Sequence, residues 1–226
     1  MTDKVLETPP LSGNWGVPGQ GEIVDPATSG LDLERGYRYL YVRQPDGSEK
    51  MMYQMLTEAD FLSPQEGDVM PKRPFHAQAE WEIAQTLVPY LKARRPELTV
   101  FNDLIMKWGI PGFPEPSPDF SVVPNVRDPN ADRGEFDCPS EGTRPILVIE
   151  IVSPRYRTSD RETKPEVYEY VGVQEYVILD HRLRRGKYTD EVIGHRLVRV
   201  RNPGRYRSIQ PDEDGRLYLQ TIGVFI

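Results

Sequence analysis

The sequence predicts an α/β (α+β) fold in which helices pack on a β-sheet, preceded by an N-terminal arm and a hairpin. Short apolar runs have the length and composition of buried strands, most clearly Ile146 to Val152. Two longer segments, 76–93 and 159–171, space their apolar residues as helices on a sheet do. The 226 residues suffice for one well-buried domain, so we expect the main part of the chain to form a single domain.

The first 75 residues predict an arm and a hairpin. Residues 1–34 are rich in Pro, Gly, Ser and Asp without apolar periodicity, which predicts a flexible N-terminal arm. Two β-prone runs, Tyr37–Arg43 and Lys50–Leu56, enclose a Pro-Asp-Gly-Ser turn and predict a hairpin. A helical turn over Thr57–Leu62 and a Pro- and Gly-rich stretch complete the connecting region 35–75.

The main domain, 76–226, opens with a predicted helix from His76 to Ala93. Ile83, Leu87 and Leu91 recur at helical spacing, so they should form the face that packs on the sheet. His76 and Glu80 extend the same face towards the start of the helix. His76 could make a local hydrogen bond at the start of the helix, and Glu80 could form a surface salt bridge. Alternatively, either side chain could face a metal site.

A second helix is predicted from Ser159 to Val171. Ser159 and Glu162 fit a capping box, and Gly172 is suited to end the helix. Pro165 should disfavour helical geometry at Lys164, which precedes it. The predicted strands are Leu98–Leu104, Asp119–Val123, Ile146–Val152, Gln174–Asp180, Val192–Val200, Arg205–Gln210 and Leu217–Ile222.

Composition excludes several classes of protein. Cys138 is the only cysteine, so an internal disulfide and a thiolate zinc cluster are ruled out. Apolar runs are too short for a membrane span, and the first residues lack the pattern of a signal peptide, so we expect a cytoplasmic protein without membrane contact. The net charge of −7 argues against a simple nucleic-acid coat.

Basic residues nevertheless gather near the C-terminus. Residues 181–207 hold nine basic residues against two acids. This segment is either a solvated strand face or a surface that binds a polyanion, and the sequence leaves both readings open. The nine are Arg182, Arg184, Arg185, Lys187, Arg196, Arg199, Arg201, Arg205 and Arg207.

One carboxylate interrupts the most apolar strand. Glu150 lies between Ile149 and Ile151, where an ionised side chain needs a positive partner. Asp119 stands at the start of another predicted strand. If the two strands are neighbours, both carboxylates could share a hard cation such as Mg²⁺ or Mn²⁺. Such an ion would activate a water molecule and screen the charge on a phosphodiester.

Basic groups follow the acidic strand. Lys164 shares a helix face with Tyr168, so its ammonium could point to the sheet and serve the same site. An ordinary surface lysine with a buried stem is the alternative. Arg155, Arg157 and Arg161 lie between Glu150 and Lys164 and would flank the site with phosphate-binding groups.

Short motifs follow one another in a fixed order along the chain. They are Leu56-Thr57-Glu58 with Phe61, the His76 helix, Pro118-Asp119, Glu150-Ile151-Val152-Ser153-Pro154, Asp160, Lys164, Tyr168, Gly172-Val173, Glu175-Tyr176 and Asp180. The series resembles the Uma family of bacterial restriction endonucleases, a branch of the PD-(D/E)XK nuclease superfamily, over most of residues 56–226. The Pro-Asp pair alone has little specificity, whereas the ordered set is fairly specific.

The resemblance implies a restriction-endonuclease-like mixed sheet flanked by helices and a Mg²⁺- (or Mn²⁺-) dependent endonuclease that cuts DNA. Asp119 and Glu150 would be catalytic metal ligands, and Glu80 a further ligand. Lys164 would be the catalytic lysine, displaced from strand position 152 onto the helix. The arginines, Tyr168 and His76 would bind substrate, and a homodimer would let two sites act on two strands.

Two other interpretations stay open at this point. The chain could be a nuclease-like fold that binds nucleic acid or a protein partner without cutting, which the net negative charge and the displaced lysine favour. Alternatively, Glu150 could be salt-bridged to Lys164 or an arginine in a purely structural cluster.

Overall fold

Six strands form the central sheet of the computed structural model, which describes residues 15–27, 33–198 and 204–226. Within this sheet, β8 (Leu147–Ile151) and β9 (Glu175–Arg184) pair in parallel, because a helical crossover joins them, and the other described neighbours are antiparallel. The mixed sheet predicted from the sequence is therefore confirmed. In spatial order its strands are β11 (Arg205–Ser208), β10 (Lys187–Val198), β9 (Glu175–Arg184), β8 (Leu147–Ile151), β6 (Phe120–Pro124) and β4 (Leu98–Phe101).

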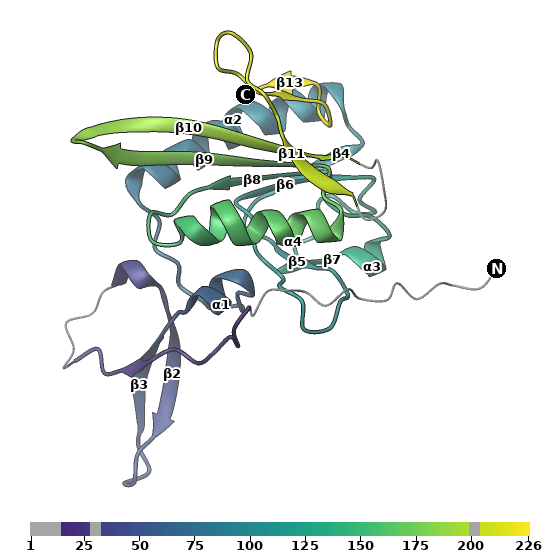
Figure 1. Ribbon diagram of the computed structural model, residues 1–226. Coiled ribbons are helices and arrows are strands. Elements are labelled where there is room, and N and C mark those ends of the chain that lie inside the picture. The colour runs from purple at the N-terminus through teal and green to yellow at the C-terminus, as the bar shows by residue number, and fades with distance from the viewer. Residues whose placement is uncertain (1–14, 28–32, 199–203) are drawn as a thin grey trace.

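Helices cover both faces of this sheet (Figure 1). Helix α2 (Pro74–Arg94) lies on one face, where Leu91 packs with Leu147 and Ile149 of β8. Helix α4 (Lys164–Val171) lies on the other, where Tyr168 packs with Val148. Strand β8 alternates between these two cores, so Glu150 faces α4 from a strand with no exposed residue.

The predicted hairpin is confirmed and projects away from the sheet (Figure 1). Strands β2 (Tyr37–Arg43) and β3 (Glu49–Met55) form it, and β1 (Ile23–Val24), from the segment predicted as an arm, pairs with β3. The rest of that segment includes 1–14 and 28–32, which lie outside the described residues. The short helix η1 (Leu33–Arg35) precedes the hairpin, and helix α1 (Glu58–Leu62), with Thr57 as its N-cap, follows the hairpin.

The helix that carries Lys164 starts earlier than predicted. The backbone is helical from residue 157, and η2 (Ser159–Thr163) is a π-helical turn before α4. The predicted capping box at Ser159 is wrong, because a cap needs an extended backbone and Thr158 is already helical, at φ −62 and ψ −43. Gly172 ends the helix at φ 83, as predicted.

The π-helical turn also explains how Pro165 is accommodated. Lys164 has helical angles, φ −61 and ψ −36, so the expected disruption at this residue is wrong. In a regular α-helix the proline ring would clash with the carbonyl group four residues earlier. The wider turn, in which the Lys164 N–H donates to the Ser159 carbonyl five residues earlier, relieves this clash and keeps the helix intact.

Smaller elements complete the structure. The predicted strand over residues 217–222 is instead two short strands, β12 (Tyr218–Leu219) and β13 (Val224–Phe225), joined by a turn. A parallel pair, β5 (Ile105–Lys107) and β7 (Glu135–Asp137), and helix α3 (Cys138–Glu141) lie beside the α4 face of the sheet. No helix in the described residues is long and apolar enough to cross a membrane.

Candidate active site

The buried acid of β8 has two partners on the helix that covers it. The Tyr168 hydroxyl donates to Oε1 of Glu150 at 2.8 Å. The Lys164 ammonium lies 3.0 Å from Oε2. Lys164 and Tyr168 are one turn apart, so both side chains reach the same carboxylate from one helix face. Lys164 therefore points at the sheet and is not a surface lysine.

Asp160 is a site residue that sequence reasoning did not select. Its Oδ1 lies 2.8 Å from the Lys164 ammonium, and its side chain is as buried as those of Glu150 and Lys164. The four-residue spacing between Asp160 and Lys164 was a readable signal, because such residues are neighbours on a helix. The ammonium thus sits between two buried carboxylates.

Asp119 stands beside Glu150 on the neighbouring strand. Phe120 pairs with Ile149 in the antiparallel register, which brings the preceding Asp119 next to Glu150. Oδ2 of Asp119 accepts a hydrogen bond from the Ile151 backbone N–H at 2.6 Å. Oδ1 lies 2.9 Å from Nε2 of His76, at the start of α2. The predicted convergence of the two acids from separate strands is thus present.

Burial and crowded charge shift the acid–base properties of these groups. Desolvation, with Asp119 and Asp160 nearby, raises the pKa of Glu150 to about 8 despite the attraction of Lys164. Desolvation also raises the pKa of Asp160. For Lys164, desolvation acts to lower the pKa, but Asp160 and Glu150 outweigh it, so the pKa is raised and the ammonium stays protonated.

His76 belongs to the same electrostatic group. Burial alone would lower its pKa, but the hydrogen bond and charge of Asp119 outweigh this effect and raise it. When His76 is protonated it supplies a second positive charge beside the three carboxylates of Asp119, Glu150 and Asp160. When it is neutral, that charge is absent, and Lys164 remains the cation in contact with Glu150 and Asp160.

Glu80 has a different partner. Both of its carboxylate oxygens lie 2.9 Å from the ammonium of Lys72, which also contacts Asp103. Glu80 is therefore held in a more exposed ion pair and does not share a hydrogen-bond partner with Asp119 or Glu150. Within the parts of the chain that the structure describes, no group of three or more His, Cys, Asp or Glu side chains is arranged to hold a metal ion.

Two of the three candidate phosphate-binding arginines are held by acids. Arg157 donates to Oδ1 of Asp180 at 2.8 Å, and Arg161 to Oδ2 at 2.6 Å. Asp180 is fully buried on β9, so these pairs fix the start of the helix against the sheet. Arg155 is exposed and lines a surface cavity.

The basic segment 181–207 is partly neutralised in the same way. Arg182 pairs with Glu191 at 2.6 Å, and Arg196 pairs with the buried Glu175 at 2.7 Å. The hairpin of β9 and β10 extends beyond its neighbours, and Arg185 and Lys187 near its tip are exposed (Figure 1). Arg199 and Arg201 lie outside the described residues.

The fold and the buried acids define a mixed-sheet α/β protein with a candidate hydrolytic site at adjacent strands. A family model, Uma2, described as "Putative restriction endonuclease", matches residues 65–221, and the chain belongs to this family. A solved structure of a "putative nuclease belonging to DUF820" from Anabaena variabilis is similar, with 20% identity and a TM-score of 0.40, over 64% of this chain and 84% of that chain. None of the curated proteins matches this chain.

Proposed function

We propose that this chain is a metal-dependent endonuclease that hydrolyses phosphodiester bonds of DNA. Membership of a restriction-endonuclease family supports the reaction class. The observation that carries the proposal is the ammonium of Lys164, buried between Glu150 and Asp160 beside Asp119. Two buried carboxylates, Glu150 and Asp160, contact the one ammonium, and a third, Asp119, lies beside Glu150 with His76 as its own side-chain partner. Three buried carboxylates this close together oppose one another's ionisation, as the raised pKa of Glu150 reflects, and a bound cation would favour their charged forms.

The side chains present suit a hard divalent cation. Asp119 and Glu150 offer carboxylate oxygens, and each oxygen that already accepts one hydrogen bond keeps a second acceptor position. Magnesium is commonly bound by one or two carboxylates and keeps several waters, so a third protein ligand such as Glu80 is not required. When bound there, such an ion would make a water more acidic and offset charge on the phosphodiester.

Lys164 has an electrostatic role in this proposal. Its raised pKa keeps the ammonium protonated at neutral pH, so it cannot accept a proton from water. A fixed positive charge instead stabilises the negative charge that develops on the phosphoryl oxygens. Asp160 and Tyr168 are positioning residues, because they hold Lys164 and Glu150 in place. His76 does the same for Asp119.

The test is cleavage of supercoiled plasmid and circular single-stranded DNA with Mg²⁺ or Mn²⁺. We expect the wild type to nick or cut at least one of them, and Glu150→Gln and Asp119→Asn to lose about 100-fold or more in rate. Glu135→Gln removes an exposed carboxylate on β7 and should keep wild-type activity. Equal activity of all four proteins, or none in the wild type under any condition, would remove the basis of the proposal.

The second candidate is a nuclease-like fold that binds nucleic acid or a protein partner without cutting. Two observations favour it. Tyr168 and Lys164 already contact the two carboxylate oxygens of Glu150, and the described residues contain no group of three or more His, Cys, Asp or Glu side chains that could hold a metal ion. Titration with Mn²⁺ separates the two candidates. The enzyme should show one specific site that is lost in Asp119→Asn, and the binding protein should show none.

A further inference from the structure

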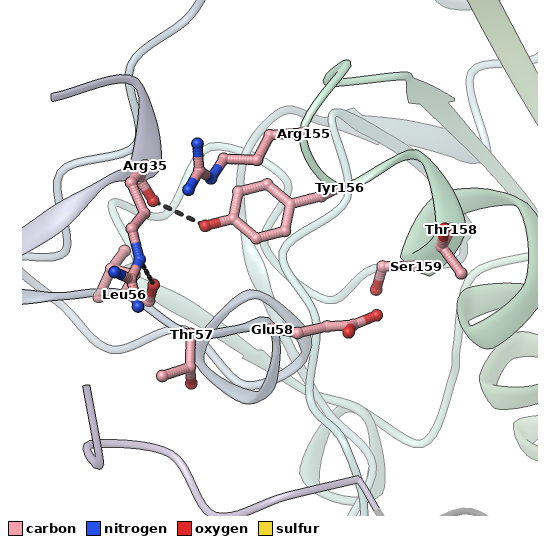
Figure 2. A pocket seen from close by; sticks show the side chains of 8 residues that line it. All are labelled: Arg35, Leu56, Thr57, Glu58, Arg155, Tyr156, Thr158 and Ser159. Carbon is pink, nitrogen blue, oxygen red and sulfur yellow. Dashed lines mark hydrogen bonds between the residues drawn. The ribbon is translucent and has the colours of Figure 1, made fainter. Parts of the chain in front are cut away.

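A surface cavity of about 370 Å³ lies between the hairpin region and the start of the helix that carries Lys164 (Figure 2). Arg35, Leu56 and Glu58 line it from one side, and Arg155, Tyr156 and Ser159 from the other. This volume is at the small end of ligand pockets, which run from about 300 to 1,000 Å³. The lining residues Arg155, Tyr156, Thr158 and Ser159 belong to the segment between Glu150 on β8 and Lys164.

Local contacts hold the walls of this cavity in place. The Tyr156 hydroxyl donates to the Arg35 carbonyl at 2.7 Å, and the Tyr156 ring stacks on Phe61 at 3.4 Å between centroids. The Arg35 Nε donates to the Leu56 carbonyl at 3.2 Å. A ligand would therefore meet a largely preformed site, which reduces the entropy lost on binding.

The two ends of the cavity differ in chemistry. Figure 2 shows the guanidinium groups of Arg35 and Arg155 on the hydroxyl side of the Tyr156 ring, and Glu58 and Ser159 on the opposite side. Two guanidinium groups suit a phosphate, which they can bind through paired hydrogen bonds. A carboxylate and a hydroxyl suit the hydroxyl and amino groups of a sugar or a base.

Ser159 gives a second, independent indication of a ligand. Its side chain is 1% exposed, and its hydroxyl has no hydrogen-bond partner among the described residues. A buried hydroxyl without a partner is unfavourable, so such groups usually have a partner in protein, water or ligand. The predicted cap role does not account for it, because the helix starts before Ser159.

We propose that this cavity binds one nucleotide unit, with the phosphate at Arg35 and Arg155 and the sugar or base at Glu58 and Ser159. The inference rests on the proposed function in one respect, namely that the substrate is a nucleic acid. The phosphate has two potential sources: the backbone of a strand whose cleavage occurs at the Glu150 and Lys164 site, or a free nucleotide. In either case the cavity recognises a nucleotide at Ser159, the residue that precedes Asp160 of that site.

The test is calorimetric titration in EDTA, where no metal-dependent cutting occurs. The probes are thymidine 5′-monophosphate, thymidine, and an unphosphorylated thymidine trinucleotide, which carries only internal phosphodiesters. We expect one phosphate-bearing probe or both to bind, and thymidine to bind at least about tenfold more weakly. Binding of the trinucleotide would identify the strand backbone as the source, and binding of the monophosphate alone would identify a free nucleotide.

Three variants locate the binding. Arg155→Gln should lower the affinity for the probe about tenfold or more, since the substitution removes a charge-assisted hydrogen bond. Ser159→Ala should lower the affinity for the probe several-fold. The free energy of unfolding should not fall, because the hydroxyl has no partner in the described residues. Arg216→Gln, which removes an exposed arginine near the C-terminus, should bind as the wild type does.

The results that would overturn the proposal are distinct from those that bear on cleavage. Failure of both phosphate-bearing probes to bind the wild type, or unchanged binding in Arg155→Gln and Ser159→Ala, would reject the cavity as a nucleotide site. Neither result depends on catalysis. Conversely, a wild type that never cuts DNA but binds nucleotide through Arg155 would reject the proposed endonuclease and retain the cavity.

Discussion

Replacement of Lys164 by Met removes the positive charge on which the buried acids depend. Methionine keeps most of the length of the side chain, so the change is mainly electrostatic. In the wild type the ammonium lies 3.0 Å from Glu150 and 2.8 Å from Asp160, and all three side chains are buried. Removal of one partner from a buried ion pair lowers the free energy of unfolding by about 3–5 kcal/mol, because the remaining charge is uncompensated. We expect a loss in this range at pH 9.

The loss should be smaller at pH 6. The pKa of Glu150 is raised from 4.5 to about 8 in the folded protein, so its contribution to stability is full below 4.5 and disappears as the pH rises through 8. Without Lys164 this pKa rises further, since the ammonium is the main group that lowers it. At pH 6 Glu150 is then neutral and needs no positive partner, so removal of the ammonium costs less. At pH 9, above the wild-type pKa of Glu150, ionisation of this buried carboxylate without the ammonium is unfavourable, so the loss of stability is larger.

Urea unfolding of wild type and Lys164→Met at pH 6 and pH 9 measures this difference as a shift in midpoint at constant m-value. Glu150→Gln and the double variant complete a thermodynamic cycle. The double variant should recover about 1–3 kcal/mol relative to the sum of the two single changes at pH 9, because the neutral amide that replaces the Glu150 carboxylate leaves no charge there. A loss below about 1 kcal/mol at both pH values would show that Lys164 is not buried between these acids.

Three further predictions concern individual side chains of the site and the core. Tyr168→Phe leaves Oε1 of Glu150 without its 2.8 Å donor, so the free energy of unfolding should fall by about 1–3 kcal/mol in urea titrations; an unchanged midpoint would contradict the hydrogen bond. Because a proton competes at Glu150, Mn²⁺ affinity should fall about tenfold per pH unit below about 8 in calorimetric titrations, and a flat profile from pH 6 to 8 would exclude Glu150 as a ligand. Burial raises the pKa of Cys138 to about 12, so a disulfide reagent at pH 8 should react with it only after unfolding, and fast reaction of the native protein would contradict its burial.

Local chemistry explains which parts of the fold were predictable. The hairpin followed from its turn residues, and β8 followed from an apolar run with one acid. Neighbouring side chains of a strand point to opposite sides, so Glu150 faces α4 while Ile149 and Ile151 pack on the α2 face. In each case the information lies within a few adjacent residues.

The parts that were not predictable depend on contacts between distant segments. The capping box failed because the chain is already helical before Ser159, where Asp180 of β9 holds Arg157 through an ion pair. The π-helical turn before α4 was not predicted, because α-helical spacing rules do not describe a hydrogen bond that spans five residues. The cavity proposed to bind a nucleotide combines Arg35 and Arg155, which are 120 residues apart in the sequence, so only the folded chain brings them together.

The central claim is that Asp119 and Glu150 together hold a divalent cation beside Lys164. A crystal of the wild-type protein soaked in Mn²⁺ tests it directly, because manganese gives an anomalous diffraction signal that locates the ion. We predict one strong peak within about 2.0–2.6 Å of a carboxylate oxygen of each acid. A map with no peak there, or with manganese bound only at other acids such as Glu80 and Asp103, would contradict the claim.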